Sequence, residues 1–135
     1  AGHARLVDDH SRDPVAIAAR LVETPYLWGG RSAFGIDCSG LVQLSHAMCG
    51  VALPRDSDML ASGAGRQIGE ATQHEPLKRG DLVFWKGHVA MIEDDNTIIH
   101  ASGHVMQVVR EPLDLAIERI GYLYGLPTVW RRIER

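Results

Sequence analysis

The hydrophobic pattern of this chain changes period once, at the turn sequence LKRGD that ends at Asp81. Before this turn, apolar residues recur at helical spacing in two segments, residues 13–23 and 38–48. After it, the runs DLVFW, HVAMIED, TIIHAS and VMQVVR are rich in β-branched and aromatic residues and are separated by turn sequences. Helices followed by consecutive strands predict an α+β domain in which the helices pack on an antiparallel sheet.

The central helix is expected to begin at Cys38 and to end near Met48, with Gly50 as the left-handed residue that stops it. A short helix is expected near residues 57–63, followed by a surface loop as far as Gly80. Another short helix, PLDLAIERI, is expected to interrupt the strands before the last one, TVWRRI. These elements place the helices before and between the strands of one sheet.

The length of 135 residues and the hydrophobic content of 45% suit one globular domain. We expect residues 1–12 to be a tail or linker remnant and residues 13–135 to form the domain. The net charge of -3 argues against a nucleic-acid partner, because neutralising phosphates requires a surplus of Lys and Arg. No apolar run approaches the roughly 20 residues needed to cross a bilayer, so no membrane partner is expected.

The two cysteines, Cys38 and Cys49, fall on the same expected helix. Their spacing along that helix is roughly 16 Å, whereas a disulfide needs Cα atoms within about 7 Å, so they should not be bonded to each other. Two reduced cysteines and the lack of an exported leader in this sequence favour a cytoplasmic location. A periplasmic or secreted location, after removal of a signal, is the alternative.

Cys38 lies in the sequence IDCSG, where a glycine-containing loop becomes a helix. Unpaired backbone N–H groups and the positive end of the helix dipole at such a position favour the thiolate over the thiol. Cys38 is therefore a candidate nucleophile. The alternative is that it only fills the loop.

A nucleophilic cysteine needs a base, and His88 and His100 lie on successive expected strands. If the hairpin between them is centred on Asp94, the two histidines lie directly opposite each other on one face, with Cβ atoms about 5 Å apart. His88 would then take the proton of Cys38, and His100 would orient the His88 ring and favour its charged form. The alternatives are half-buried histidines with ordinary hydrogen bonds, or a zinc site that these three residues form with His104.

The segments YLWGG, DCSGLVQ, LPRDSD, RGDLVFW, GHVAMI and IIHASG together resemble the NlpC/P60 family of bacterial cell-wall cysteine peptidases. The resemblance covers roughly residues 14–110, and the cysteine and both histidines come in the order and at the spacing of the family. It implies a papain-like fold. No cofactor is expected, and no metal, because no close CxxC or HExxH pair supports the zinc site. The resemblance also implies an endopeptidase that cuts peptidoglycan stem peptides or muropeptides, typically between the γ-carboxyl group of D-glutamate and the following L-diamino acid.

The resemblance further implies a role for individual residues. Cys38 would attack the carbonyl carbon, His88 would act as general base and then as general acid, and His100 would be the third, polar member of the triad. Tyr26 would give its hydroxyl to the oxyanion, beside the backbone N–H of Cys38.

In relatives that require a free N-terminal L-alanine, the resemblance places five residues in the substrate pocket: Trp28, Asp37, Ser39, Asp56 and Ser57. Asp56 is the candidate for binding the ammonium group, because a buried cation needs an anionic partner. The alternative is that Asp56 only caps a helix. Such relatives usually carry an upstream SH3-like domain that completes the pocket and that this sequence lacks.

Two functions of other classes remain open at this point. A catalytically silent cell-wall binding module would keep the groove but not the reactive cysteine. A related hydrolase or acyltransferase would act on another amide or on an ester.

Overall fold

The computed structural model describes residues 13–22, 31–32, 35–94, 96–102 and 107–133. Its helices and strands are, in chain order, α2 (Pro14–Ala19), β1 (Arg31–Ser32), β2 (Gly35–Ile36), α3 (Cys38–Ala47), α4 (Ser57–Gly63), β3 (Arg66–Glu70), β4 (Gln73–His74), β5 (Leu82–Trp85), β6 (His88–Asp94), β7 (Thr97–Ser102), β8 (Gln107–Pro112), α5 (Leu113–Tyr124) and β9 (Val129–Arg132). The expected α+β class is confirmed.

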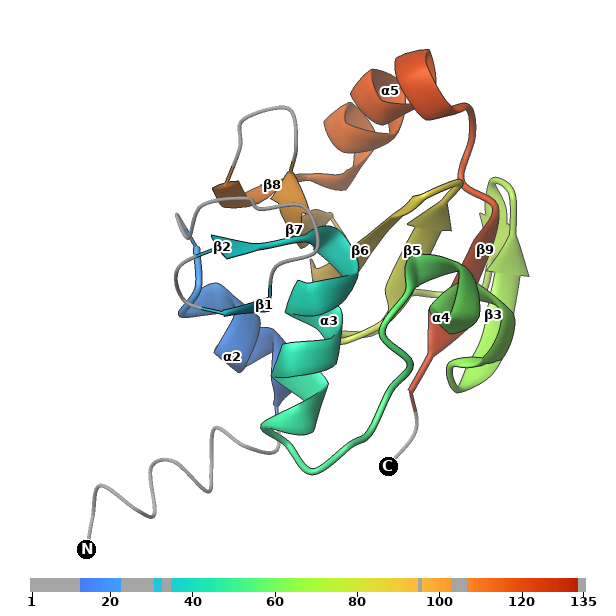
Figure 1. The fold of residues 1–135 in the computed structure, drawn as a ribbon. Helices are drawn as coiled ribbons and strands as arrows, with labels where there is room; N and C mark the ends of the chain where they lie inside the picture. Colours follow the sequence, from blue (N-terminus) through green and yellow to red (C-terminus); the bar gives the residue numbers. More distant parts are fainter. Residues whose placement is uncertain (1–12, 23–30, 33–34, 95, 103–106, 134–135) are drawn as a thin grey trace, which may run out of the picture.

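The main sheet has seven strands in the order β4-β3-β9-β5-β6-β7-β8, and every neighbouring pair is antiparallel (Figure 1). Strands β5 to β8 follow one another as a meander. The last strand, β9, lies between β3 and β5 and joins the two parts of the sheet. A separate two-stranded sheet pairs β1 with β2.

Alternating side chains of the main sheet bury two different cores. On β5, Leu82 and Phe84 belong to the core that packs against α2, α3 and α4, which includes Leu41. Val83 and Trp85 belong to the core that packs against α5. In Figure 1, α5 accordingly lies at the top of the view, apart from the other helices. The meander is therefore covered on both faces.

The capping chemistry of the helices agrees with the sequence. Asp13 is the N-cap of α2, and its carboxylate accepts a hydrogen bond of 3.0 Å from the N–H of Val15. Gly50 has a φ of +82° just after α3, as expected of the residue that ends this helix. No helix among the described residues is long and apolar enough to span a bilayer.

The expected surface loop between α4 and Gly80 is wrong, because this segment contains β3 and β4. Its local pattern does not show a strand, since Ile68 is the one buried residue of β3. The strand forms because β9, about sixty positions later in the sequence, supplies its hydrogen bonds. Gly69 is needed where β4 approaches, since a Cβ there would lie 2.4 Å from the Cβ of His74.

Asp81, at the entry to β5, forms a buried ion pair with the C-terminal strand. Its carboxylate is 1% exposed and accepts hydrogen bonds from Nε and Nη2 of Arg132 at 2.8 and 2.9 Å. It also accepts a bond of 2.8 Å from the N–H of Lys78. This pair holds β9 to the turn that begins the meander.

Asp81→Ala should lower the free energy of unfolding by about 3–5 kcal/mol, because it leaves the guanidinium of Arg132 without its buried partner. Arg79→Ala, in the same turn, is the matched control. Arg79 pairs with Asp13 where the two side chains are 47% and 36% exposed, so its loss should cost less than about 1 kcal/mol. Urea denaturation of both variants measures the difference, and equal losses would contradict this role of Asp81.

Candidate active site

Cys38 is the first residue of α3, and the N-cap before it fixes where this helix begins. The backbone of Asp37 is extended, and its carboxylate accepts a hydrogen bond of 2.6 Å from the N–H of Gly40. The sulfur of Cys38 lies 3.9 Å from the carbonyl oxygen of Gly87 and receives a hydrogen bond from the backbone of Val89. The helix start therefore holds the thiol against the two neighbours of His88.

His88 and His100 meet on the face of the sheet that packs against α5. Nε2 of His88 lies 2.8 Å from Nδ1 of His100, and the two rings are edge to face with centroids 5.0 Å apart. The prediction that the two rings share a face is confirmed.

The exact pairing expected for these two histidines is wrong. Met91 pairs with Ile99. Continuing this register along β6 puts Ala90 directly opposite His100, so His88 lies diagonally across from His100. The hairpin is centred one residue later than Asp94, which shifts the register by two. A shift of two keeps every side chain on its face, so the two imidazoles still meet.

Two charged residues that the sequence analysis did not identify extend the histidine pair. Nε2 of His100 hydrogen bonds to a carboxylate oxygen of Glu111, which lies on β8. Both oxygens of Glu111 accept from Nη2 of Arg119, a residue of α5, at 2.9 and 2.7 Å. The chain of contacts thus runs from His88 through His100 and Glu111 to Arg119.

A register argument could have found Glu111, since β7 and β8 also form a hairpin. His100 pairs with Val109, so a residue two positions along β8 lies on the same face and within reach. The expected strand VMQVVR ends at Arg110 and the expected helix PLDLAIERI begins at Pro112, so Glu111 falls between them. Arg119 carries no such local signal, because only the packing of α5 on the sheet brings it there.

The resting charge state of the site differs from the expected thiolate and imidazolium. Burial raises the pKa of Cys38 above the ordinary value of 9.0 and outweighs the backbone hydrogen bonds that lower it, while the charge of Asp37 raises it further. Burial, with the electrostatic effects of His100 and Arg119, lowers the pKa of His88 to about 3. At neutral pH the pair therefore rests as a thiol and a neutral imidazole.

Asp37 and Ser39, which flank the thiol, share one guanidinium. Arg55 makes two parallel hydrogen bonds to the carboxylate of Asp37, at 3.1 and 3.0 Å, and its Nη1 also donates to Oγ of Ser39 at 2.8 Å. Asp37 is 8% exposed, so this ion pair is largely shielded from water. Arg55 lies in the motif LPRDSD, in which the residues expected at the site were Asp56 and Ser57.

The same ion pair brings the segment after Arg55 to the start of α3. Asp56 is exposed and stands at the N-cap position of α4, but its side chain makes no capping hydrogen bond to this helix. Ser57 is the partly exposed first residue of α4. Tyr26, Trp28 and His104 lie outside the described residues.

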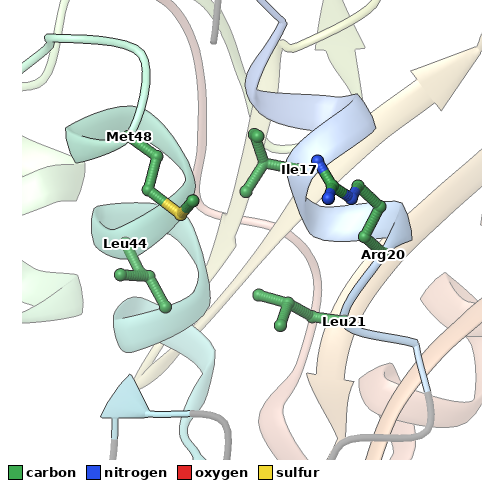
Figure 2. Close-up of a pocket in the computed structure, with 5 residues that line it drawn as sticks. All are labelled: Ile17, Arg20, Leu21, Leu44 and Met48. Carbon is green, nitrogen blue, oxygen red and sulfur yellow. The ribbon is translucent and has the colours of Figure 1, made fainter. Parts of the chain in front are cut away.

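A pocket between α2 and α3 lies away from this site. It is lined by Ile17, Arg20, Leu21, Leu44 and Met48, which belong to α2, the turn after it, the far half of α3 and the C-cap of α3 (Figure 2). Its walls are mainly aliphatic and contain none of the candidate catalytic residues. Within the part of the chain that the structure describes, no three His, Cys, Asp or Glu side chains are grouped as a metal site would need.

The fold and the site define a papain-like α+β domain, with a thiol at the start of a helix and two histidines on the adjoining sheet. The model of the NlpC/P60 family matches residues 23–117. The chain belongs to the NlpC/P60 family.

Individual relatives agree with this assignment. Dipeptidyl-peptidase 6 of Lysinibacillus sphaericus is 40% identical over 88 residues, which are 65% of this chain and 31% of that protein. The γ-D-glutamyl-L-lysine dipeptidyl-peptidase of Bacillus cereus is 40% identical over 85 residues, which are 57% of this chain and 24% of that protein. The solved structure of the peptidoglycan hydrolase RipB from Mycobacterium tuberculosis has a TM-score of 0.73 and 29% identity, covering 99% of this chain and 68% of that one.

The chain therefore spans less than a third of these two curated relatives.

The neutral resting pair predicts how Cys38 reacts with iodoacetamide. Because its pKa is raised, the thiolate fraction at any given pH is smaller than for an ordinary thiol, and it grows until the pH passes that raised value. In a Cys49→Ala background, the alkylation rate of Cys38 should keep rising with pH to beyond 9.0, the ordinary thiol value. Mass spectrometry of the Cys38 peptide measures this rate, and a plateau already reached in mildly acidic buffer would contradict the neutral pair.

Proposed function

We propose that this chain is a cysteine endopeptidase that hydrolyses peptidoglycan stem peptides at the bond between γ-D-glutamate and an L-diamino acid. The observation that carries the proposal is the thiol of Cys38, held at a helix start against the strand that bears His88. Membership of the NlpC/P60 family supports the choice of substrate. So do the names of two relatives, a γ-D-glutamyl-L-lysine dipeptidyl-peptidase and a peptidoglycan hydrolase.

In the first half of the reaction, the sulfur of Cys38 attacks the γ-carbonyl carbon while its proton passes to Nδ1 of His88. The backbone N–H of Cys38 and the hydroxyl of Tyr26 would hold the negative oxygen of the tetrahedral intermediate. The intermediate then collapses to a thioester. The bond to nitrogen breaks, and His88 gives its proton to the leaving amine of the diamino acid.

In the second half, His88 takes a proton from water, and the resulting hydroxide adds to the thioester carbonyl. The carbon–sulfur bond breaks, the free γ-carboxyl group leaves, and the proton returns to Cys38. His88 is unprotonated at neutral pH, as a general base must be before it acts, because burial and the electrostatic effects of His100 and Arg119 lower its pKa to about 3. No cofactor takes part in these steps.

For the substrate's amino terminus, Asp56 is the better candidate of the two nearby acids. The carboxylate of Asp37 already binds Arg55 through both oxygens, whereas Asp56 is exposed and does not cap α4. Asp56 would pair with the ammonium group of the stem peptide's L-alanine. An upstream SH3-like domain would complete the pocket in a longer protein, and a cytoplasmic site of action on recycled wall peptides is part of this proposal.

Digestion of the synthetic peptide L-Ala-γ-D-Glu-diaminopimelate tests the proposal. The wild-type chain should release free diaminopimelate, detected by mass spectrometry, and Cys38→Ala should release none because the thioester cannot form. A silent binding module, whose cysteine is not reactive, would release nothing. Turnover of an acyl ester but not of this peptide would favour the related hydrolase or acyltransferase, and either result would overturn the proposal.

Acetylating the peptide's amino group tests the role of Asp56. Acetylation should raise KM for the wild-type chain by about 10-fold or more, the value of a lost charge-assisted hydrogen bond. Asp56→Asn should remove this difference between the two peptides. Asp58→Asn is the matched control, since Asp58 is an exposed acid in the first turn of the same helix, and it should preserve the difference.

A further inference from the structure

We propose that Glu111, held by Arg119, is a positioning residue that sets the tautomers of both histidines and so keeps Nδ1 of His88 unprotonated toward Cys38. The proposal concerns a carboxylate that touches neither the thiol nor the first histidine. Its kinetic consequence rests on the proposed peptidase function, whereas its consequence for the tautomers does not.

The tautomers follow from the order of donors and acceptors. A carboxylate can only accept, so Nε2 of His100 must carry a proton to hydrogen bond with Glu111. When the His100 ring carries this one proton, its Nδ1 is an acceptor, and in the 2.8 Å contact Nε2 of His88 donates. The neutral ring of His88 therefore has its lone pair on Nδ1, the nitrogen that the contact with His100 leaves for the thiol.

Arg119 keeps the carboxylate at the end of this chain negatively charged. Burial alone would raise the pKa of Glu111, but hydrogen bonds and charges from His100 and Arg119 outweigh it and lower the pKa below the ordinary 4.5. Nη2 of Arg119 donates to both oxygens, at 2.9 and 2.7 Å, and so holds the carboxylate beside His100. The side chains are 20% and 31% exposed, so solvent screens the pair only in part.

The same chain stabilises the positive charge that His88 acquires during the reaction. When His88 takes the proton of Cys38, its Nε2–H bond to His100 strengthens, and His100 passes the polarisation to the carboxylate of Glu111. A neutral acceptor in place of Glu111 would lose this effect even if it preserved the geometry. The expected loss is therefore one of turnover and not of substrate binding.

Glu111→Gln tests the tautomer directly, because an amide has only one oxygen. Arg119 should bind that oxygen, which turns the amide NH2 toward His100 and makes Nε2 of His100 an acceptor. Both histidines should then switch tautomer, and Nδ1 of His88 should carry a proton. Nitrogen-15 NMR of the imidazole rings distinguishes protonated from bare ring nitrogens without any substrate.

The kinetic arm uses the γ-D-Glu-diaminopimelate peptide. Glu111→Gln should lower kcat by about 10- to 100-fold with KM unchanged, the usual effect of removing a group that orients a catalytic side chain. Adding Arg119→Leu to Glu111→Gln should restore part of the wild-type tautomer and of kcat, because the amide is then free to turn its oxygen to His100. A merely structural role of the ion pair would make the double variant worse than the single one.

Glu93→Gln is the matched control, since Glu93 also pairs with an arginine of β8, Arg110, at 2.7 and 3.0 Å on the exposed surface. It should change neither the tautomers nor kcat. Unchanged tautomers in Glu111→Gln would overturn the inference, as would a loss of kcat that only follows a lower melting temperature. A wild-type chain that does not cleave the peptide, but whose tautomers switch in Glu111→Gln, would overturn the proposed function and support this inference.

Discussion

The hydrogen bond between Nε2 of His88 and Nδ1 of His100 is the contact on which the rest of the site depends. It requires two adjoining strands in a register that keeps both histidines on one face, and that face is covered by α5. The opposite face carries α3, which brings Cys38 to the first residues of the same strand. Cys38 therefore meets the sheet at Gly87 and Val89, the two neighbours of His88, where the histidine pair begins.

Burial decides the resting chemistry of this site. A helix start stabilises a thiolate, but Cys38 is 7% exposed, and loss of hydration raises the pKa of its thiol more than the backbone N–H groups lower it. The same loss of hydration is the main reason that His88 is neutral at neutral pH. Charge separation is then confined to the reaction itself, where the relay through His100 ends on the carboxylate of Glu111.

Much of this structure could be predicted from the sequence, because the signals are local. Helix caps, turn residues and strand periodicity located α3, β5, β6 and β7, and with them Cys38 and the two histidines on their shared face. The parts that could not be predicted depend on contacts between distant segments. β3 forms only because β9 pairs with it, Arg119 reaches Glu111 only because α5 packs on the sheet, and Arg55 reaches Asp37 across a loop. The charge of the thiol depends on burial, which no local motif reports.

Neutron diffraction from a deuterium-exchanged crystal at neutral pH locates the protons of this relay directly. We expect deuterium on the sulfur of Cys38 and on Nε2 of both His88 and His100. The Nδ1 atoms of the two histidines should carry none. A bare sulfur beside a doubly protonated His88 would show a preformed ion pair. That result would contradict the claim that burial keeps the nucleophile and its base neutral until substrate arrives.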